Sequence, residues 1–401
     1  MNRLKETAIQ TIDAAHNDLL NLSHDIHTNP ELSLVEHKSV AFIGKVLHDK
    51  GFDFRLGVGG LDTAFIATKH GKKVGPHIAF LAEYDALPGI GHACGHNIIA
   101  TCATGAFLGV SAVIDNLEGS ISIIGTPGEE ADGGKILLLD AGIFNDIDFA
   151  LMMHPSSGRS LVGRGGRAAT NISVDFIGKS AHSSVPNKGI NALSAVISSF
   201  QNIDLLRPTL ESEDNINGIV THGGVAANVI PGEASCEFSL RARTLADLNN
   251  LVEKVKLAIC SAEMLTGARA KVNVGIMYAE RYSNIPMCTL FKDNMALLGE
   301  EVEWANPVGM YGSSDIGNIS IELPIIHDYL WITPEGVNSH NSDFTQHSIS
   351  MRADEVAIKG AKGLAMSAID ILSSADLQKE IKEFHRQQVP ASYIAKQKRL
   401  D

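Results

Sequence analysis

Two residues that bind metals well stand close together in the segment His92-Ala93-Cys94-Gly95-His96-Asn97. A thiolate and an imidazole are both good ligands for zinc and related divalent ions. Cys94 and His96 are two positions apart and are flanked by Gly91 and Gly95, so the backbone can turn both side chains toward one point. Taken alone, the segment is equally compatible with a buried free thiol beside a core histidine.

A pair of adjacent acids follows an apolar run in Gly125-Thr126-Pro127-Gly128-Glu129-Glu130. Adjacent residues of an extended chain point in opposite directions, so one carboxylate can bind a metal while its neighbour faces a water above it. That division of labour requires two acids side by side. The alternative is an exposed acidic turn, because the chain carries 46 acidic residues against 33 basic ones.

Two histidines complete a possible ligand set. His154 precedes Pro155 at the end of a short apolar run, and His340 lies in Asn338-Ser339-His340-Asn341. The chain has 16 histidines, and most of them must have structural roles. Only the position of a histidine relative to another motif marks it as a candidate ligand.

The elements that must position these residues form an α/β layer. Apolar runs at 63–68, 78–81, 121–124 and 149–153 predict strands, 98–114 predicts a helix, and 8–50 predicts two helices joined at the proline of 29–31. This order favours a mostly parallel sheet. The polar side chains of such sheets gather at the carboxyl ends of the strands, where Asp85, Glu129, Glu130 and His154 are expected.

The middle of the chain has a different order of predicted strands and helices. It predicts strands at 171–178, 218–222, 234–243 and 270–276, and helices at 191–206 and 245–264. This βαββαβ order is typical of a ferredoxin-like unit. We therefore predict an inserted small domain at 168–283, and a larger domain that consists of 1–167 and 284–401 and closes with a helix at 353–372. The charged tail after Asp376 is expected to be a solvated helix.

Composition narrows the class of protein. A chain of 401 residues with 44% hydrophobic residues can bury a substantial core and favours two domains. The net charge of −13 and the lack of a basic stripe disfavour a nucleic-acid partner. The absence of a signal-like start or a membrane-length apolar stretch indicates a cytoplasmic protein without a membrane partner. Five cysteines without paired spacing argue against a disulfide framework.

Matching segments run through most of the chain. They are 27–32 with Glu36, 83–88, 92–97, Glu129-Glu130, His154, 178–183, 223–231, 312–315 and His340. In this order they resemble the M20 peptidase and amidohydrolase family, specifically its aminoacylase-like branch with a cysteine metal ligand. The stretch 83–97 is similar to the subgroup that holds M20 domain-containing dipeptidases and the aminobenzoyl-glutamate hydrolase.

The resemblance implies a zinc-peptidase-like catalytic domain, with a mixed and mostly parallel sheet flanked by helices, and an inserted ferredoxin-like lid and dimerisation domain. It also implies two divalent metal ions per subunit, with zinc, manganese, cobalt and nickel all open. Cys94 would bridge them. His96 and His154 would bind one ion, Glu130 and His340 would bind the other, and Glu129 would be the general base.

Further roles follow from the same resemblance. Asp85 would orient a ligand histidine from behind. His182 would reach the active site of a partner subunit and stabilise the developing oxyanion, which requires a homodimer. Asn228 and Arg241 are candidates for holding the carboxylate of the substrate, with Arg243 as the competitor of Arg241.

The expected function is hydrolysis of the amide bond of a small-molecule N-acyl amino acid or dipeptide by metal-activated water. One alternative makes Cys94 a nucleophile with His96 as its base, which would leave the adjacent acids without a role. Another is a non-catalytic amino-acid binding protein on the same scaffold. The sequence leaves open the substrate, the role of His92 and whether Glu83 binds metal.

Overall fold

The computed structural model describes residues 2–306, 309 and 311–393. Its contacts divide the chain into unit 1, which is Met1–Gly165 with Arg281–Asp401, and unit 2, which is Gly166–Glu280. The predicted ends of the insertion, 168 and 283, lie two and three residues from the ends of unit 2. Among the described residues, no helix has the length and apolar character that crossing a bilayer requires.

Within the described residues of unit 1, eight strands form one sheet in the order β1-β2-β4-β3-β5-β14-β6-β13. Strands β4, β3, β5 and β14 run parallel at its centre, whereas β1 and β2 pair antiparallel at one edge. The predicted mixed, mostly parallel sheet is therefore confirmed. The strands are β1 (Arg55–Leu56), β2 (Phe65–His70), β3 (Lys73–Ala82), β4 (Glu118–Gly125), β5 (Phe149–Ser157), β6 (Leu161–Val162), β13 (Glu303–Trp304) and β14 (Ile325–Thr333).

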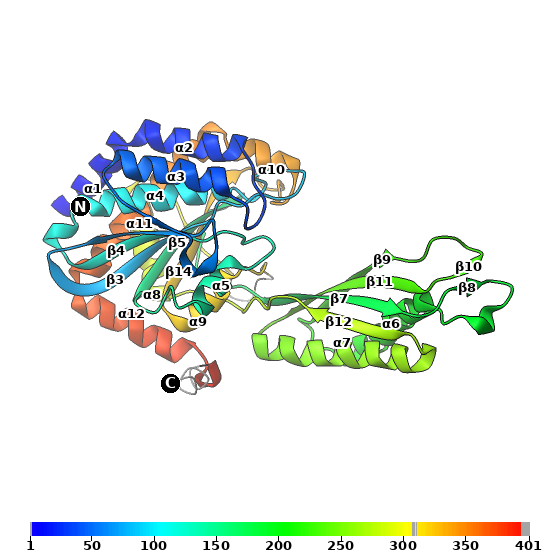
Figure 1. The fold of residues 1–401 in the computed structure, drawn as a ribbon. Helices are drawn as coiled ribbons and strands as arrows, with labels where there is room; N and C mark the ends of the chain where they lie inside the picture. Colours follow the sequence, from blue (N-terminus) through cyan, green and yellow to red (C-terminus); the bar gives the residue numbers. More distant parts are fainter. Residues whose placement is uncertain (1, 307–308, 310, 394–401) are drawn as a thin grey trace. The chain divides into compact units, whose positions relative to one another are not determined.

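Helices cover both faces of this sheet (Figure 1). One face packs against helices that include α4 and α11, and the other against α5 and α9. The helices are α1 (Arg3–Ala14), α2 (His16–Thr28), α3 (His37–Asp49), α4 (His96–Ser111), α5 (Gly134–Asp140), α8 (Ile285–Leu297), α9 (Ile316–Glu322), α10 (Ser342–His347), α11 (Met351–Ser373) and α12 (Ala375–Gln388).

The central strands are apolar on both sides because each faces a helical layer. In β3, Ile78 and Phe80 enter the core beneath α4 and α11, whereas Ala79 and Leu81 enter the core on the other face. A strand buried on both faces reads as a continuous apolar run rather than an alternating one. This is the pattern from which β3, β4 and β5 were predicted.

Four details of unit 1 differ from the prediction. Residues 8–50 form three helices, because α1 ends before Ala15, whose ψ of 5° departs from helical geometry. The predicted helix 98–114 ends at Ser111 and is followed by a 3-10 turn at Ile114–Asn116. The central strand β14 was not predicted. Helix α12 is also more than a solvated tail, because it buries Ile381 completely.

Unit 2 has the predicted ferredoxin-like topology. Its four main strands form an antiparallel sheet in the order β12-β7-β11-β9, with α6 and α7 packed on one face. A bridge between Ala169 and Tyr278 holds the two ends of the unit side by side. The elements are β7 (Ala168–Ile177), β8 (Ala181–His182), α6 (Ala192–Leu206), β9 (Asn215–His222), β10 (Val229–Ile230), β11 (Glu233–Ala242), α7 (Leu245–Thr266) and β12 (Arg269–Val274).

Candidate metal centre

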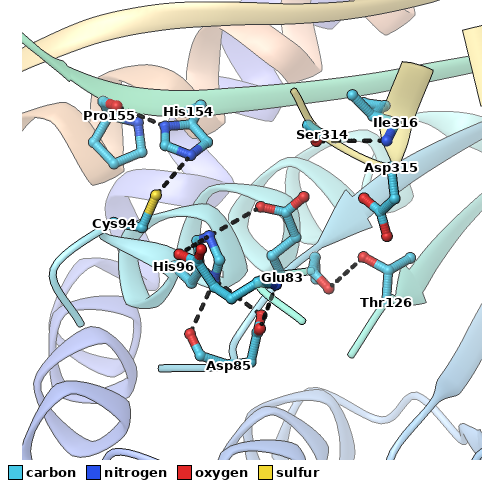
Figure 2. A network of polar contacts seen from close by, with 12 residues as sticks. Glu83, Asp85, Cys94, His96, Thr126, His154, Pro155, Ser314, Asp315 and Ile316 are labelled. Carbon is cyan, nitrogen blue, oxygen red and sulfur yellow. Dashed lines mark hydrogen bonds and ion pairs between the residues drawn. The ribbon is translucent and has the colours of Figure 1, made fainter. Parts of the chain in front are cut away.

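Polar residues from unit 1 gather at the carboxyl ends of its parallel strands. Asp85 follows β3, Glu129 and Glu130 follow β4, and His154 lies near the end of β5. Because these three strands are neighbours in the sheet, their ends bring the side chains into one cluster. Figure 2 shows Asp85 and His154 in this cluster with Cys94 and His96.

The turn before α4 presents Cys94 and His96 to this cluster. Gly95 is the N-cap of α4 and has a φ of 79°, in the left-handed region that favours glycine. A Cβ at this position would also lie 2.5 Å from Cγ of Pro155. Gly95 therefore lets the turn approach the strand end that carries His154.

The predicted ligands form two groups that share one sulfur atom. Cys94 Sγ lies 3.6 Å from Nε2 of His154 and 3.6 Å from Nε2 of His340. Cys94, His96 and His154 offer ligand atoms that all lie within 4.8 Å of one another. The same holds for Cys94, Glu130 and His340.

His96 is buried and His154 is half-buried, and both point their Nε2 atoms into the cluster. His154 Nδ1 donates to the carbonyl oxygen of Pro155 at 2.6 Å, and His96 Nδ1 lies 3.0 Å from Oδ1 of Asp85 (Figure 2). Nε2 of His96 and Oε1 of Glu130 are buried without a hydrogen-bond partner among the described residues. Buried polar atoms are rarely left unpaired, so this donor set fits a metal ion.

The electrostatics of the cluster suit a cation. Burial lowers the pKa of His154 to about 3, so its imidazole is neutral and can act as a ligand. Burial lowers the pKa of His96 too, but the charge of Asp85 and its hydrogen bond outweigh that effect and raise it well above the ordinary value. Burial also raises the pKa of the Cys94 thiol. A thiolate at this position therefore needs positive charge beside it.

Asp85 ties the ligand-bearing segments together. The residue is buried, with one carboxylate oxygen facing His96 and the other accepting from the backbone N–H of Glu130 at 2.9 Å. Its carboxylate therefore fixes both the ring orientation of one candidate ligand and the backbone of another. This is the arrangement expected of a residue that orients a ligand from behind.

A buried lysine lies behind the cluster. Lys135 Nζ lies 2.7 Å from Oδ1 of Asp315 and 2.5 Å from Oε1 of Glu83, and both ion pairs are inaccessible to solvent. Glu83, Asp315 and Glu129 also converge within 4.8 Å of one another. Lys135 was not predicted to belong to the site, and Asp315 was noted only as part of a motif. The sequence signal was the lysine that follows Gly133-Gly134 just after the acidic pair.

Glu129 lies beside both groups of acids. It lies within 4.8 Å of His96 and Glu130, as well as of Glu83 and Asp315. Burial and then the neighbouring carboxylates, with Glu83 first, raise its pKa well above the ordinary value. A carboxylate in such surroundings can take up a proton readily.

His340 differs from the other candidate ligands. Its backbone has a φ of 65°, a strained value for a residue with a side chain, and its N–H donates to the carbonyl oxygen of Ala93 at 2.9 Å. Its side chain is 54% exposed and lies 3.5 Å from Oε2 of Glu130. The loop around His340 is thus fastened to the turn that carries Cys94.

Two residues of the initial segment are outside the groups of converging ligand atoms. Asn97 donates to Oγ of Ser23 and to the carbonyl oxygen of Ser348, each at 2.9 Å. His92 is buried with its ring centroid 6.1 Å from that of His27. Asn97 is therefore a structural residue, and the segment contributes Cys94 and His96 to the cluster.

The candidate residues of unit 2 lie in two places. His182 in β8 pairs with Val229 of β10, and the N–H of Ser183 donates to the carbonyl oxygen of Asn228, so His182 and Asn228 are neighbours and both are exposed. Arg241 lies near the opposite end of β11, on the side of the sheet away from α6 and α7. Unit 2 by itself does not bring all three together.

Comparison with known proteins gives matches over most of the chain. A family model described as a peptidase dimerisation domain matches residues 162–262. A mouse Xaa-Arg dipeptidase is 33% identical over 95% of this chain and 92% of its own length. One of the subunits of the p-aminobenzoyl-glutamate hydrolase of Escherichia coli K12 is 28% identical over 64% of this chain and 57% of its own length.

Solved structures share the fold. A putative aminohydrolase from methicillin-resistant Staphylococcus aureus has a TM-score of 0.76 and 19% identity, over 92% of this chain and 100% of that chain. A dinuclear metal-binding peptidase of the M20 family from Bacillus subtilis has a TM-score of 0.65 and 22% identity, over 89% of this chain and 99% of that chain.

Proposed function

The chain belongs to the M20 peptidase family, and on this premise we propose that it is a binuclear metal-dependent amidohydrolase that cleaves an N-acyl amino acid or a small dipeptide. The mouse relative that matches nearly the whole chain is named as an Xaa-Arg dipeptidase, and the shorter bacterial match as a hydrolase of p-aminobenzoyl-glutamate. Each name describes the release of an amino acid from a small amide. Small dipeptides are therefore the first substrates to test.

One observation carries the proposal: Cys94 Sγ belongs to two sets of three converging ligand atoms. His96 and His154 complete one set, and Glu130 and His340 complete the other. A thiolate can be shared between two cations, and two cations offset the burial that otherwise keeps the thiol protonated. Histidine, cysteine and carboxylate ligands accept several divalent ions, so zinc, manganese, cobalt and nickel are all candidates.

The residues divide the chemistry between them. Two divalent ions at this site would supply the charge that polarises the amide carbonyl and makes a water acidic near neutral pH. Glu129 takes the proton of the attacking water and passes it to the leaving amine. Asp85 holds His96 in one orientation, and Lys135 offsets the negative charge of Glu83 and Asp315 behind the base.

Unit 2 supplies the proposed dimer contact. It matches the dimerisation-domain model, and β9 forms an edge of its sheet with Ile219 and Val220 exposed. An exposed apolar edge strand is a surface on which a second strand can pair. We propose that two copies associate through unit 2 and that His182 of one copy then stabilises the oxyanion at the site of the other.

The test combines metal analysis with a substrate panel. Purified protein is assayed against Xaa-Arg dipeptides, N-acyl amino acids and aminobenzoyl-glutamate, before and after exhaustive chelation. We expect two ions per chain by elemental analysis, loss of hydrolysis on chelation and recovery with manganese, zinc or cobalt. Full activity without metal, together with loss of activity on alkylation of Cys94, would instead support the cysteine-nucleophile alternative.

A further inference from the structure

A buried arginine lies beside the candidate metal centre and has only neutral hydrogen-bond acceptors. Arg281 is 8% exposed and donates through Nε to the carbonyl oxygen of Arg164 at 3.1 Å and through Nη1 to Oη of Tyr329 at 3.2 Å. It also donates to Nδ1 of His327 and to the carbonyl oxygen of Gly165. Its donors are well used, but none of these acceptors neutralises its charge.

Arg164 adds a second positive charge at the same place. Its guanidinium carbon lies 4.5 Å from the ring centroid of Tyr329 and 5.0 Å from that of Tyr311. Aromatic faces hold a guanidinium in place and leave the donors at its edge available. Across the part of the chain that the structure describes, no acidic side chain forms an ion pair with Arg164 or Arg281, and Nε of Arg164 is buried without an acceptor.

His327 provides a second donor without an acceptor. Because Nδ1 of His327 accepts from Arg281, the ring hydrogen is on Nε2. Nε2 is buried and has no hydrogen-bond partner among the described residues, and His327 is only 2% exposed. An unpaired buried donor costs free energy, so two of them in one cluster indicate that an acceptor belongs there.

This cluster lies directly against the candidate metal centre. The ring centroid of His154 is 5.3 Å from that of His327 and 5.4 Å from that of Tyr329. Nε2 of the same His154 lies 3.6 Å from Cys94 Sγ. His154 is therefore at once a candidate metal ligand and a direct neighbour of the cluster that carries the two positive charges.

We propose that Arg164 and Nε2–H of His327 form the subsite that binds the free carboxylate of the amino acid released by hydrolysis. Arg281 is the positioning residue, because its contacts with Gly165, His327 and Tyr329 hold the subsite in place. This inference rests on the proposed function and names its substrate class: amides whose amino-acid side carries a free carboxylate. It assigns to Arg164 the contact for which Arg241 of unit 2 is the competing candidate.

The test compares free acids with their carboxamides. The substrates are alanyl-arginine, N-acetyl-methionine and the C-terminal amide of each, and the variants are Arg164→Met, Arg164→Lys and Arg241→Met. Arg159→Met is the matched control, because Arg159 is an arginine of unit 1 whose side chain is 62% exposed. Thermal unfolding confirms that each variant is folded.

Arg164→Met is expected to lower kcat/KM for the free acids by about 10- to 100-fold, the usual effect of losing a charge-assisted hydrogen bond. Hydrolysis of the amides should change little. The kcat/KM of Arg164→Lys for the free acids should fall between the values of the wild type and Arg164→Met. A lysine ammonium keeps the positive charge but cannot make the paired hydrogen bonds of a planar guanidinium. Arg159→Met should match the wild type.

A binding measurement separates this inference from the proposed function. Arginine and argininamide are titrated calorimetrically into the purified wild type and Arg164→Met. Suppose that no substrate is hydrolysed, but the wild type binds arginine more tightly than argininamide and Arg164→Met does not. The proposed function then fails and the proposed subsite is retained. Equal losses for acids and amides, no preference for arginine in the wild type, or loss of the preference only in Arg241→Met would overturn the subsite.

Discussion

The two units of this chain keep their ionisable residues in opposite surroundings. Most of the buried acidic, basic and histidine side chains that the structure describes lie in unit 1, where they include Glu83, Asp85, His96, Lys135 and Asp315, whereas among them unit 2 contributes only Glu280. Unit 2 instead exposes apolar residues: 12 of the 22 large exposed apolar side chains described lie in this unit, which has just over a quarter of the chain.

This difference indicates which unit is suited to binding metal ions and which is suited to associating with a second chain. Buried ionisable groups are costly unless other charges, hydrogen bonds or metals satisfy them. The fold of unit 1 therefore brings many of its buried ionisable groups together in one polar cluster. Exposed apolar side chains on a small unit mark a surface for association. The comparison therefore supports the proposals that place the metal centre in unit 1 and the dimer contact in unit 2.

The largest expected effect comes from the centre of unit 1. Glu129→Gln keeps the size of the side chain but removes the proton acceptor, so kcat should fall by about 10³-fold, within the range for loss of a general base. Metal content should not change, because Glu129 is not among the proposed ligands. Glu118→Gln, an exposed acid of β4, is the matched control. A kcat within tenfold of the wild type would remove Glu129 from the mechanism.

The next effect tests unit 2. His182→Ala should lower kcat by about 10²-fold, as expected for loss of one oxyanion donor. If His182 acts on the site of the partner, mixing Glu129→Gln with His182→Ala creates mixed dimers with one intact site each. Random exchange of subunits should then restore about a quarter of wild-type activity. No recovery in exchanged samples would show that His182 does not act across a dimer.

A smaller effect is expected behind the metal ligands. Asp85→Asn weakens the acceptor for Nδ1 of His96 and should lower metal affinity by about 10- to 100-fold, with less effect on kcat at saturating metal. Competition with a chromogenic chelator measures the affinity. The exposed Asp115→Asn is the control. Unchanged affinity would mean that the position of His96 does not depend on Asp85.

The smallest effect concerns pH and the core of unit 1. Burial raises the pKa of Asp328 from 3.8 to about 7, so the folded protein keeps a proton there that the unfolded chain releases above about pH 4. The free energy of unfolding should therefore fall as pH rises, by about 2 kcal/mol between pH 5 and 7. Asp328→Asn should remove this part of the slope in urea titrations. If the free energy of unfolding of the variant falls equally steeply with pH, groups other than Asp328 cause the dependence.

Much of this architecture could be predicted from local patterns. Strands β3, β4 and β5 are apolar runs that end in polar residues, so both the sheet and the position of Asp85, Glu130 and His154 followed from the sequence. Strand β14 was missed because His327 and Asp328 interrupt its apolar run. The break at Ala15 was missed because neither proline nor glycine marks it.

The surroundings of Glu83 could not be predicted in the same way. Its ion-pair partner Lys135 is 52 positions later, and Lys135 also contacts Asp315, which is 180 positions further along the chain. No spacing rule connects residues that only the finished fold brings together. The same applies to Arg164 and His327, which come from segments on opposite sides of the insertion.

The bridge between Ala169 and Tyr278 has a consequence for how the chain folds. Strand β14 must pair with β5 across the whole insertion, and such long-range pairing is slow because a long loop has to close first. Unit 2 has its own core, and once it forms, that bridge holds its ends together. The connection between β5 and β14 is then shortened from more than 160 residues to about 60, which recovers about 1 kcal/mol of closure entropy, at about 0.6 kcal/mol per halving. Early folding of unit 2 would thus speed completion of the large sheet. During synthesis from the N-terminus β5 emerges long before β14, so unit 2 can fold in the interval.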